Sequence, residues 1–145
     1  NYSSISDSPE LTCSITHSKE NSIAVCGNKA NINSLGVDLE FKSRSIKEGS
    51  ERFFVNEKDQ FPTESSLLKW CIKEACFKAL SNSGEPVKLL KDIVINGHFF
   101  YYSTPSEYKK NKFEVLEIDG KFIVIAYCLN SIAEKQMELK NIDDA

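Results

Sequence analysis

Residues 67–80 have the sequence LLKWCIKEACFKAL, and this stretch decides the fold because it is the strongest helix pattern in the chain. Apolar residues recur along it with the 3.6-residue period of a helix, so one stripe is expected to face a core. That stripe consists of Leu68, Ile72, Ala75, Cys76 and Ala79. A second stripe, at i, i+4 and i+8, carries Trp70, Glu74 and Lys78.

This second stripe has two interpretations. Glu–Lys pairs four residues apart are common on solvated helix faces, where each contributes only about 0.2–0.5 kcal/mol. On that view, Glu74 and Lys78 are a solvent-facing pair beside a half-buried Trp70. Alternatively, an indole, a carboxylate and an ammonium on one face form a surface suited to chemistry. The helix pattern alone does not choose between them.

Residues 34–40 alternate as a half-buried β-strand does. One face is expected to carry Leu35, Val37 and Leu39, and the other Gly36, Asp38 and Glu40. Two carboxylates on one strand face repel each other. They indicate either an edge strand with a solvated acidic face or half of a hard-cation site, since a divalent ion turns that repulsion into attraction.

The remaining segments predict an α+β fold in which an antiparallel sheet packs against a long central helix. Strand patterns at 11–16 and 22–26 indicate a hairpin, and a second hairpin is centred on Asp119-Gly120, between 113–118 and 121–128. Further strands are expected at 92–96 and 97–102, and further helices at 46–54 and 131–140.

We expect a single domain over residues 1–145, with a loose lead-in at 1–10 and a frayed tail at 141–145. Thr63 is a candidate N-cap of the main helix, which should end near residues 82–84, with Gly84 just beyond it.

Composition excludes some classes of function. The formal net charge is -3 and the sequence pI is about 5.5, which argues against nucleic-acid binding driven by bulk charge. No apolar run approaches the roughly 20 residues of a membrane span. The cysteines at positions 13, 26, 71, 76 and 128 lie in apolar segments without a Cys-x-x-Cys pair, so we expect buried free thiols in a cytoplasmic protein.

The strand and the helix gain a joint meaning if their acidic faces meet. Asp38, Glu40 and Glu74 would then form a cluster of three carboxylates that is unfavourable without a cation. Mg²⁺ prefers such oxygen ligands and usually shares its shell with substrate phosphates. Together with Lys78, a divalent cation would balance the three negative charges. The pattern therefore favours phosphoryl-type chemistry, in which positioning and charge neutralisation provide most of the catalysis.

These residues resemble the paired signature of the 4′-phosphopantetheinyl transferases. Residues 36–40, GVDLE, match its Gly-hydrophobic-Asp-x-Glu half, and residues 70–78, WCIKEACFK, match its Trp-x-x-Lys-Glu-Ala/Ser-x-x-Lys half. The segments SITHS at 14–18 and RFF at 52–54 resemble two further family segments. The motifs are closer to the larger two-lobed members than to the small holo-acyl-carrier-protein synthases, and the resemblance covers roughly half of the chain.

The resemblance implies a role for each matching position. Asp38, Glu40 and Glu74 would bind Mg²⁺. Lys78 would hold the diphosphate of coenzyme A, with Lys73 as a weaker candidate nearby. His17 would contact the 3′-phosphate of the ADP moiety, whereas outside this motif a lone His at a strand end is more often structural.

The implied reaction transfers phosphopantetheine from coenzyme A to a serine of an apo carrier protein, releasing 3′,5′-ADP. Glu57, Glu74 or a metal-bound water could take the proton of the serine hydroxyl. The rival hypotheses are a non-catalytic module that binds coenzyme A or a carrier protein, and an unrelated Mg²⁺-dependent nucleotide hydrolase. The hydrolase hypothesis lacks support because this sequence has no Gly-rich phosphate loop. The binding-module hypothesis does not explain the three carboxylates with Lys78, which a pure binder does not need.

One departure from the larger members concerns what precedes the motifs. A two-lobed transferase has another lobe there, whereas a dozen residues stand before Cys13. The chain is then one half of a larger transferase, a short form that associates with a second copy, or a stand-alone short form. We favour the short form that self-associates. Neither a nucleic acid nor a membrane is an expected partner, and the pathway of the carrier protein is not indicated.

Overall fold

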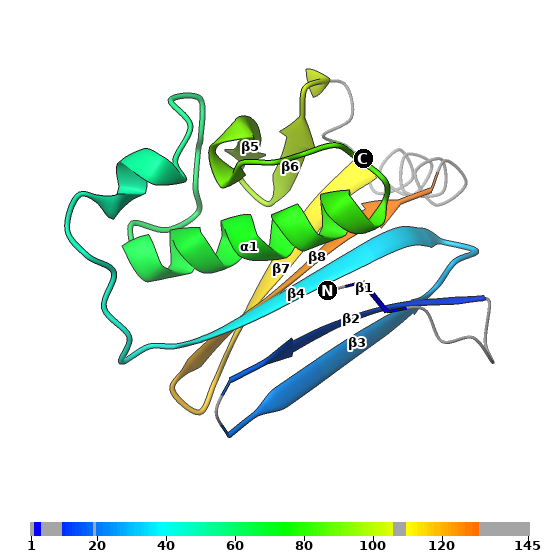
Figure 1. The fold of residues 1–145 in the computed structure, drawn as a ribbon, viewed down its shortest axis with the longest axis horizontal. Helices are drawn as coiled ribbons and strands as arrows, with labels where there is room; N and C mark the ends of the chain where they lie inside the picture. Colours follow the sequence, from blue (N-terminus) through cyan, green and yellow to red (C-terminus); the bar gives the residue numbers. More distant parts are fainter. Residues whose placement is uncertain (1, 4–9, 19, 106–109, 131–145) are drawn as a thin grey trace, which may run out of the picture.

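The computed structural model describes residues 2–3, 10–18, 20–105 and 110–130. Within them, one α-helix packs against β4, the first strand of a five-stranded antiparallel sheet, and a three-stranded antiparallel sheet lies on the other side of β4 (Figure 1). The elements in chain order are β1 (Tyr2–Ser3), β2 (Leu11–His17), β3 (Ser22–Asn28), β4 (Ile32–Phe41), η1 (Ser50–Phe53), α1 (Ser66–Asn82), η2 (Leu90–Asp92), β5 (Ile93–Asn96), β6 (Phe99–Tyr102), β7 (Asn111–Ile118) and β8 (Lys121–Leu129).

The two sheets have the strand orders β1-β2-β3 and β4-β8-β7-β6-β5. In the larger sheet, β4 pairs antiparallel with β8, which is the last described strand in the chain order, and β4 lies at one edge of the sheet. The β7–β8 hairpin turns at Asp119 and Gly120, whose φ values of 49° and 73° are those of a two-residue turn with left-handed residues. The Asp-Gly prediction is therefore confirmed.

Gly36 sets the distance between β4 and α1. A Cβ placed on it would lie 2.1 Å from the carbonyl oxygen of Ala75 and 2.5 Å from the amide nitrogen of Ala79. Only glycine therefore allows this close approach of strand and helix backbones. The contact also needs small helix residues, and Ala75 and Ala79 are both fully buried.

Side chains hydrogen-bond the edge of β4 that faces away from β8. Lys78 Nζ donates to the carbonyl oxygen of Val37 at 2.8 Å, and Asn82 Nδ2 donates to that of Leu35 at 2.9 Å. From the other side, the Val37 amide donates to Ser14 Oγ of β2 at 3.2 Å. These bonds satisfy edge groups that would otherwise be open, and they attach β4 to both α1 and β2.

The predicted main helix is confirmed, with two adjustments. It runs for 17 residues, Ser66–Asn82, so the expectation of a long central helix is not met. Its N-cap is Ser65, whose hydroxyl accepts from the Leu68 amide at 3.2 Å, rather than Thr63. The helix ends as predicted, with Gly84 beyond it at a φ of 91°.

The apolar stripe of α1 is buried as predicted and forms the main core with β5, β6, β7 and β8. A smaller core lies between β4 and the three-stranded sheet and includes Val37, Leu39 and Ile123. The two faces predicted for β4 are therefore both covered, one by α1 and the other by β3. β4 is an edge strand of its sheet, as one interpretation held, but its acidic face is not solvated, since Asp38 is 8% exposed and the Glu40 side chain 13%.

Three other expectations differ from the structure. The helix predicted at 46–54 is reduced to the short η1. The lead-in contains β1, which pairs with β2. The helix expected at 131–140 and the tail at 141–145 fall outside the described residues.

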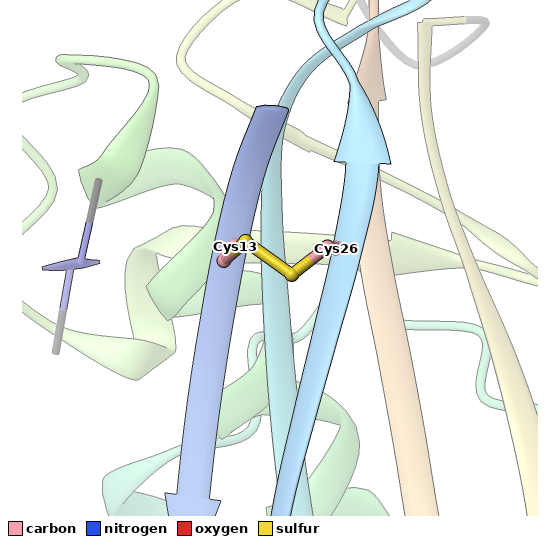
Figure 2. The surroundings of a disulfide bond; sticks show 2 residues. All are labelled: Cys13 and Cys26. Atoms are coloured by element: carbon pink, nitrogen blue, oxygen red, sulfur yellow. A yellow bond between two sulfur atoms is a disulfide. The ribbon is translucent and has the colours of Figure 1, made fainter. Parts of the chain in front are cut away.

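A disulfide between Cys13 and Cys26 corrects the expectation that every cysteine is a free thiol (Figure 2). The β2–β3 register places these two residues directly opposite each other on neighbouring strands. Spacing alone did not reveal that register, because it depends on how the intervening turn closes. Cys71 and Cys76 are buried thiols, as expected. No helix in the described part of the chain is long and apolar enough to cross a membrane.

Candidate functional site

Asp38 is a buried carboxylate near the C-terminal end of β4, with 8% of its surface exposed. Its Oδ1 lies 3.7 Å from Lys78 Nζ, and its buried Oδ2 has no hydrogen-bond donor among the described residues. Burial, aided by the negative charges of Glu40 and Glu74 and opposed by Lys78, raises the pKa of Asp38 to about 7. The protein therefore holds this carboxyl group where its ionised form is unfavourable.

Glu40 lies two residues further along β4 and is held by a cation that the sequence motifs do not include. Nη1 of Arg44 donates to Oε1 and Oε2 of Glu40 at 2.7 and 2.8 Å. The Glu40 side chain is 13% exposed, whereas that of Arg44 is 49% exposed. The hydrogen bonds with Glu40, together with the charges of Asp38 and Glu74, raise the pKa of Arg44.

Glu74 and Lys78 extend the cluster from the facing helix. Both are half-buried, and Lys78 turns to β4 rather than to Glu74. No ion pair joins Glu74 to another residue of the described ranges. Burial raises the pKa of Glu74, with Lys78 and Arg44 opposing that shift and Glu40 adding to it. Glu74 is thus a desolvated carboxylate with electrostatic neighbours but no direct partner.

The cluster is suited to a hard divalent cation by its chemistry. Three carboxylates supply the oxygen donors that Mg²⁺ prefers, and Asp38 Oδ2 is a buried acceptor without a donor. In the described residues, however, no three His, Cys, Asp or Glu side chains are already grouped closely enough to hold a metal ion. The side chains of Glu40 and Asp38 are turned instead to Arg44 and Lys78.

A mainly apolar pocket of about 420 Å³ borders the cluster. Arg44 lines it together with Ile46, Phe54 and Trp70. Trp70, on the same stripe of α1 as Glu74, packs edge-on against the ring of Phe54 at 5.4 Å, and the guanidinium of Arg44 lies 6.0 Å from the indole centroid. The predicted Trp–Glu–Lys face is therefore half-buried, and Trp70 is its member that lines the pocket.

His17 ends β2 and is exposed. Figure 1 shows β2 and β4 side by side and running in the same direction, and the Ser14–Val37 hydrogen bond joins them. The C-terminal end of β2, where His17 lies, is therefore on the same side of the molecule as the acidic end of β4. No direct contact between His17 and a carboxylate is observed among the described residues.

Lys73 is not part of the cluster, although it was a candidate for holding the diphosphate. Its side chain is fully buried, and Nζ lies 2.9 Å from Oδ2 of Asp59, whose side chain is 1% exposed. Nζ also donates to the carbonyl oxygens of Leu90 and Ile93. Asp59 in turn accepts from the amides of Asn56 and Ile95, so the pair ties the chain before α1 to the helix and to β5. This geometry indicates a structural role for Lys73.

Glu57 lines a different pocket from the one that Arg44 and Trp70 line. It lines a pocket of about 870 Å³ with Arg52, Lys91 and Tyr101, and Asp38, Glu40, Glu74 and Lys78 do not line it. The role of Glu57 as a proton acceptor stays a prediction from the sequence.

Arg44 is the residue that the sequence motifs missed. The available signal was a basic residue four positions after Glu40, which suggests a charge pair only if the chain turns back after β4. The structure makes this turn, with the Arg44 amide donating to the Phe41 carbonyl oxygen at 2.9 Å. Comparison with known proteins adds no family assignment, because neither the protein-family models nor the curated proteins include a match to this chain.

Proposed function

We propose that this chain is a Mg²⁺-dependent 4′-phosphopantetheinyl transferase, which moves phosphopantetheine from coenzyme A to a serine of an apo carrier protein. The observation that carries the proposal is the unpartnered, buried Oδ2 of Asp38 within a cluster completed by Glu40 and Glu74. Burying a carboxylate oxygen without a hydrogen-bond donor costs stability, and a function that needs a cation at that position accounts for this cost. The resemblance of residues 36–40 and 70–78 to the family signature supplies the reaction class.

In this proposal the resemblance gives each residue of the cluster a role, and the position of each supports it. Asp38, Glu40 and Glu74 would hold Mg²⁺, which when bound neutralises phosphate charge and polarises the phosphoryl oxygens. Lys78 has its ammonium between β4 and α1, where it can pair with an incoming diphosphate once Asp38 has another counterion. The half-buried Glu74 carboxylate has a raised pKa and no ion pair with any described residue, which suits it to accept a serine proton as well.

The proposal is tested by incubating the protein with Mg²⁺, coenzyme A and an apo carrier protein. We expect the carrier to gain the mass of one phosphopantetheine, measured by intact-mass spectrometry. A carrier whose acceptor serine is replaced by alanine is the control and should gain nothing. No mass gain across apo carriers of fatty acid, polyketide and peptide synthesis would favour the module that binds without transfer.

Glu74→Gln is expected to reduce the rate of transfer by about 100-fold or more, because a neutral amide neither neutralises a cation nor accepts a proton. The fold should survive, since Glu74 makes no ion pair to other described residues and is half-buried. Glu85→Gln, at an exposed position beyond α1, is the matched control and should keep its rate. Turnover by Glu74→Gln at the unmodified rate would remove Glu74 from the proposed site; circular dichroism checks the fold of both variants.

A further inference from the structure

Arg44 is bonded to one of the carboxylates that would bind a cation in the proposed site. Both of its contacts with Glu40 are short, and both oxygens of that carboxylate are used. Its positive charge also acts on Asp38 and Glu74, so it is shared by all three acidic residues. The described structure thus has a guanidinium bonded to one of the three carboxylates to which the proposed function assigns a divalent ion, and influenced by the charges of the other two.

The chain holds this guanidinium through a turn that fixes its backbone and leaves its side chain reachable. The Arg44 amide is bonded to the carbonyl oxygen of Phe41, and the Lys42 amide is bonded to that of Gly120 in the β7–β8 turn. The Arg44 side chain is half exposed and lies beside the pocket that Trp70 lines. It can therefore leave Glu40 for solvent or for the pocket without disrupting the core.

We propose that Arg44 is a resident counter-cation, which holds Glu40 in the metal-free protein and competes with a divalent metal ion for that carboxylate. This inference rests on the proposed function, because it takes Asp38, Glu40 and Glu74 as the metal ligands. It explains why no three acidic side chains of the described residues are grouped as ligands: the guanidinium and Lys78 each hold one of them. Metal affinity is then set partly by the free energy of releasing Arg44.

The competition predicts that removing Arg44 strengthens metal binding. Mn²⁺ is the probe, because it takes the same oxygen ligands and its free form is counted directly by electron paramagnetic resonance. We expect Arg44→Gln to bind Mn²⁺ about 3- to 10-fold more tightly than the unmodified protein, a range suited to a half-exposed bidentate pair. Arg44→Lys, which keeps the charge but loses the planar fork, should lie between the two.

Arg52→Gln is the matched control, because it removes the same unit of net charge from an exposed residue outside the cluster. Arg52 lines the separate pocket with Glu57 and lies over the ring of Phe53 at 4.7 Å. Its Mn²⁺ affinity should change by less than about 2-fold, since exposed distant charges are screened. An equal gain in Arg52→Gln would show a general charge effect and would overturn the proposal.

A second readout uses Trp70, the single tryptophan of the chain, whose indole lies near the Arg44 guanidinium. Mg²⁺ should change the Trp70 emission of the unmodified protein as Arg44 moves, and the change should shrink in Arg44→Gln. If the unmodified protein binds Mn²⁺ and Arg44→Gln binds it equally or more weakly, the competition is wrong and the metal site stands. If neither protein binds Mn²⁺ at millimolar concentration, the metal-dependent function and this inference both fail.

Discussion

Gly36→Ala is expected to lower the free energy of unfolding by about 3 kcal/mol or more, which is a large effect for one methyl group. The added Cβ would meet the backbone of α1, at 2.1 Å from the Ala75 oxygen and 2.5 Å from the Ala79 nitrogen. Backbone atoms within a helix cannot rotate away as a side chain can, so β4 and α1 must separate. Urea unfolding followed by circular dichroism measures the loss.

Gly49→Ala separates this steric effect from the conformational cost of losing a glycine. Gly49 has a φ of 82° and no atom within 4 Å of the position its Cβ would take, so that substitution costs only the left-handed strain of about 1 kcal/mol. A loss in Gly36→Ala no greater than that of Gly49→Ala would contradict the close-approach argument. The same separation would move Glu74 and Lys78 away from Asp38, so transfer should fall as well.

The fold was predictable wherever a local pattern decides the structure. The apolar stripe of α1 and the Asp119-Gly120 turn depend on residues adjacent in sequence, and both predictions are confirmed. The strand at 34–40 is confirmed as part of β4, but it is buried on both faces instead of half-buried. The prediction of a helix at 46–54 was wrong for a reason that is also local. Gly49 takes a left-handed conformation immediately before η1 and interrupts the helical backbone.

Local patterns selected the acidic residues of the candidate site, but they did not identify the cations that pair with them. The two periods left open whether the acidic face of β4 meets the polar stripe of α1, and the structure places Lys78 Nζ 3.7 Å from Asp38 Oδ1. Lys73 looked equally suited to a phosphate, yet Asp59 and two carbonyl groups bury it on another side. The hydrophobic period of a helix or strand predicts the direction in which a side chain points. It does not predict which residue of a distant segment that side chain will contact, because this depends on the folded chain.

Asp38→Asn is expected to abolish transfer and, at the same time, to stabilise the metal-free protein at neutral pH. Transfer should fall by about 100-fold or more, because the amide supplies no negative charge to a cation. The stability effect has the opposite sign to that of most substitutions of buried residues. It follows from the raised pKa of Asp38, which is about 7 in the folded protein against 3.8 for the ordinary group.

The sign of that effect depends on which state binds the proton. Between about pH 4 and pH 7 the folded protein keeps the Asp38 proton while the unfolded chain has released it, so stability falls as the pH rises through this window. Asn has no proton to release, and the variant should therefore gain about 1–3 kcal/mol over the unmodified protein at pH 7.5 but little at pH 4.

Asp92→Asn, at an exposed carboxylate, is the control and should shift neither stability nor its pH dependence. Saturating Mg²⁺ should close the gap at pH 7.5, because a bound cation stabilises only the form that has the Asp38 carboxylate. A variant that is less stable than the unmodified protein at every pH would mean that Asp38 supports the fold, and the unpartnered oxygen would then lose its functional meaning.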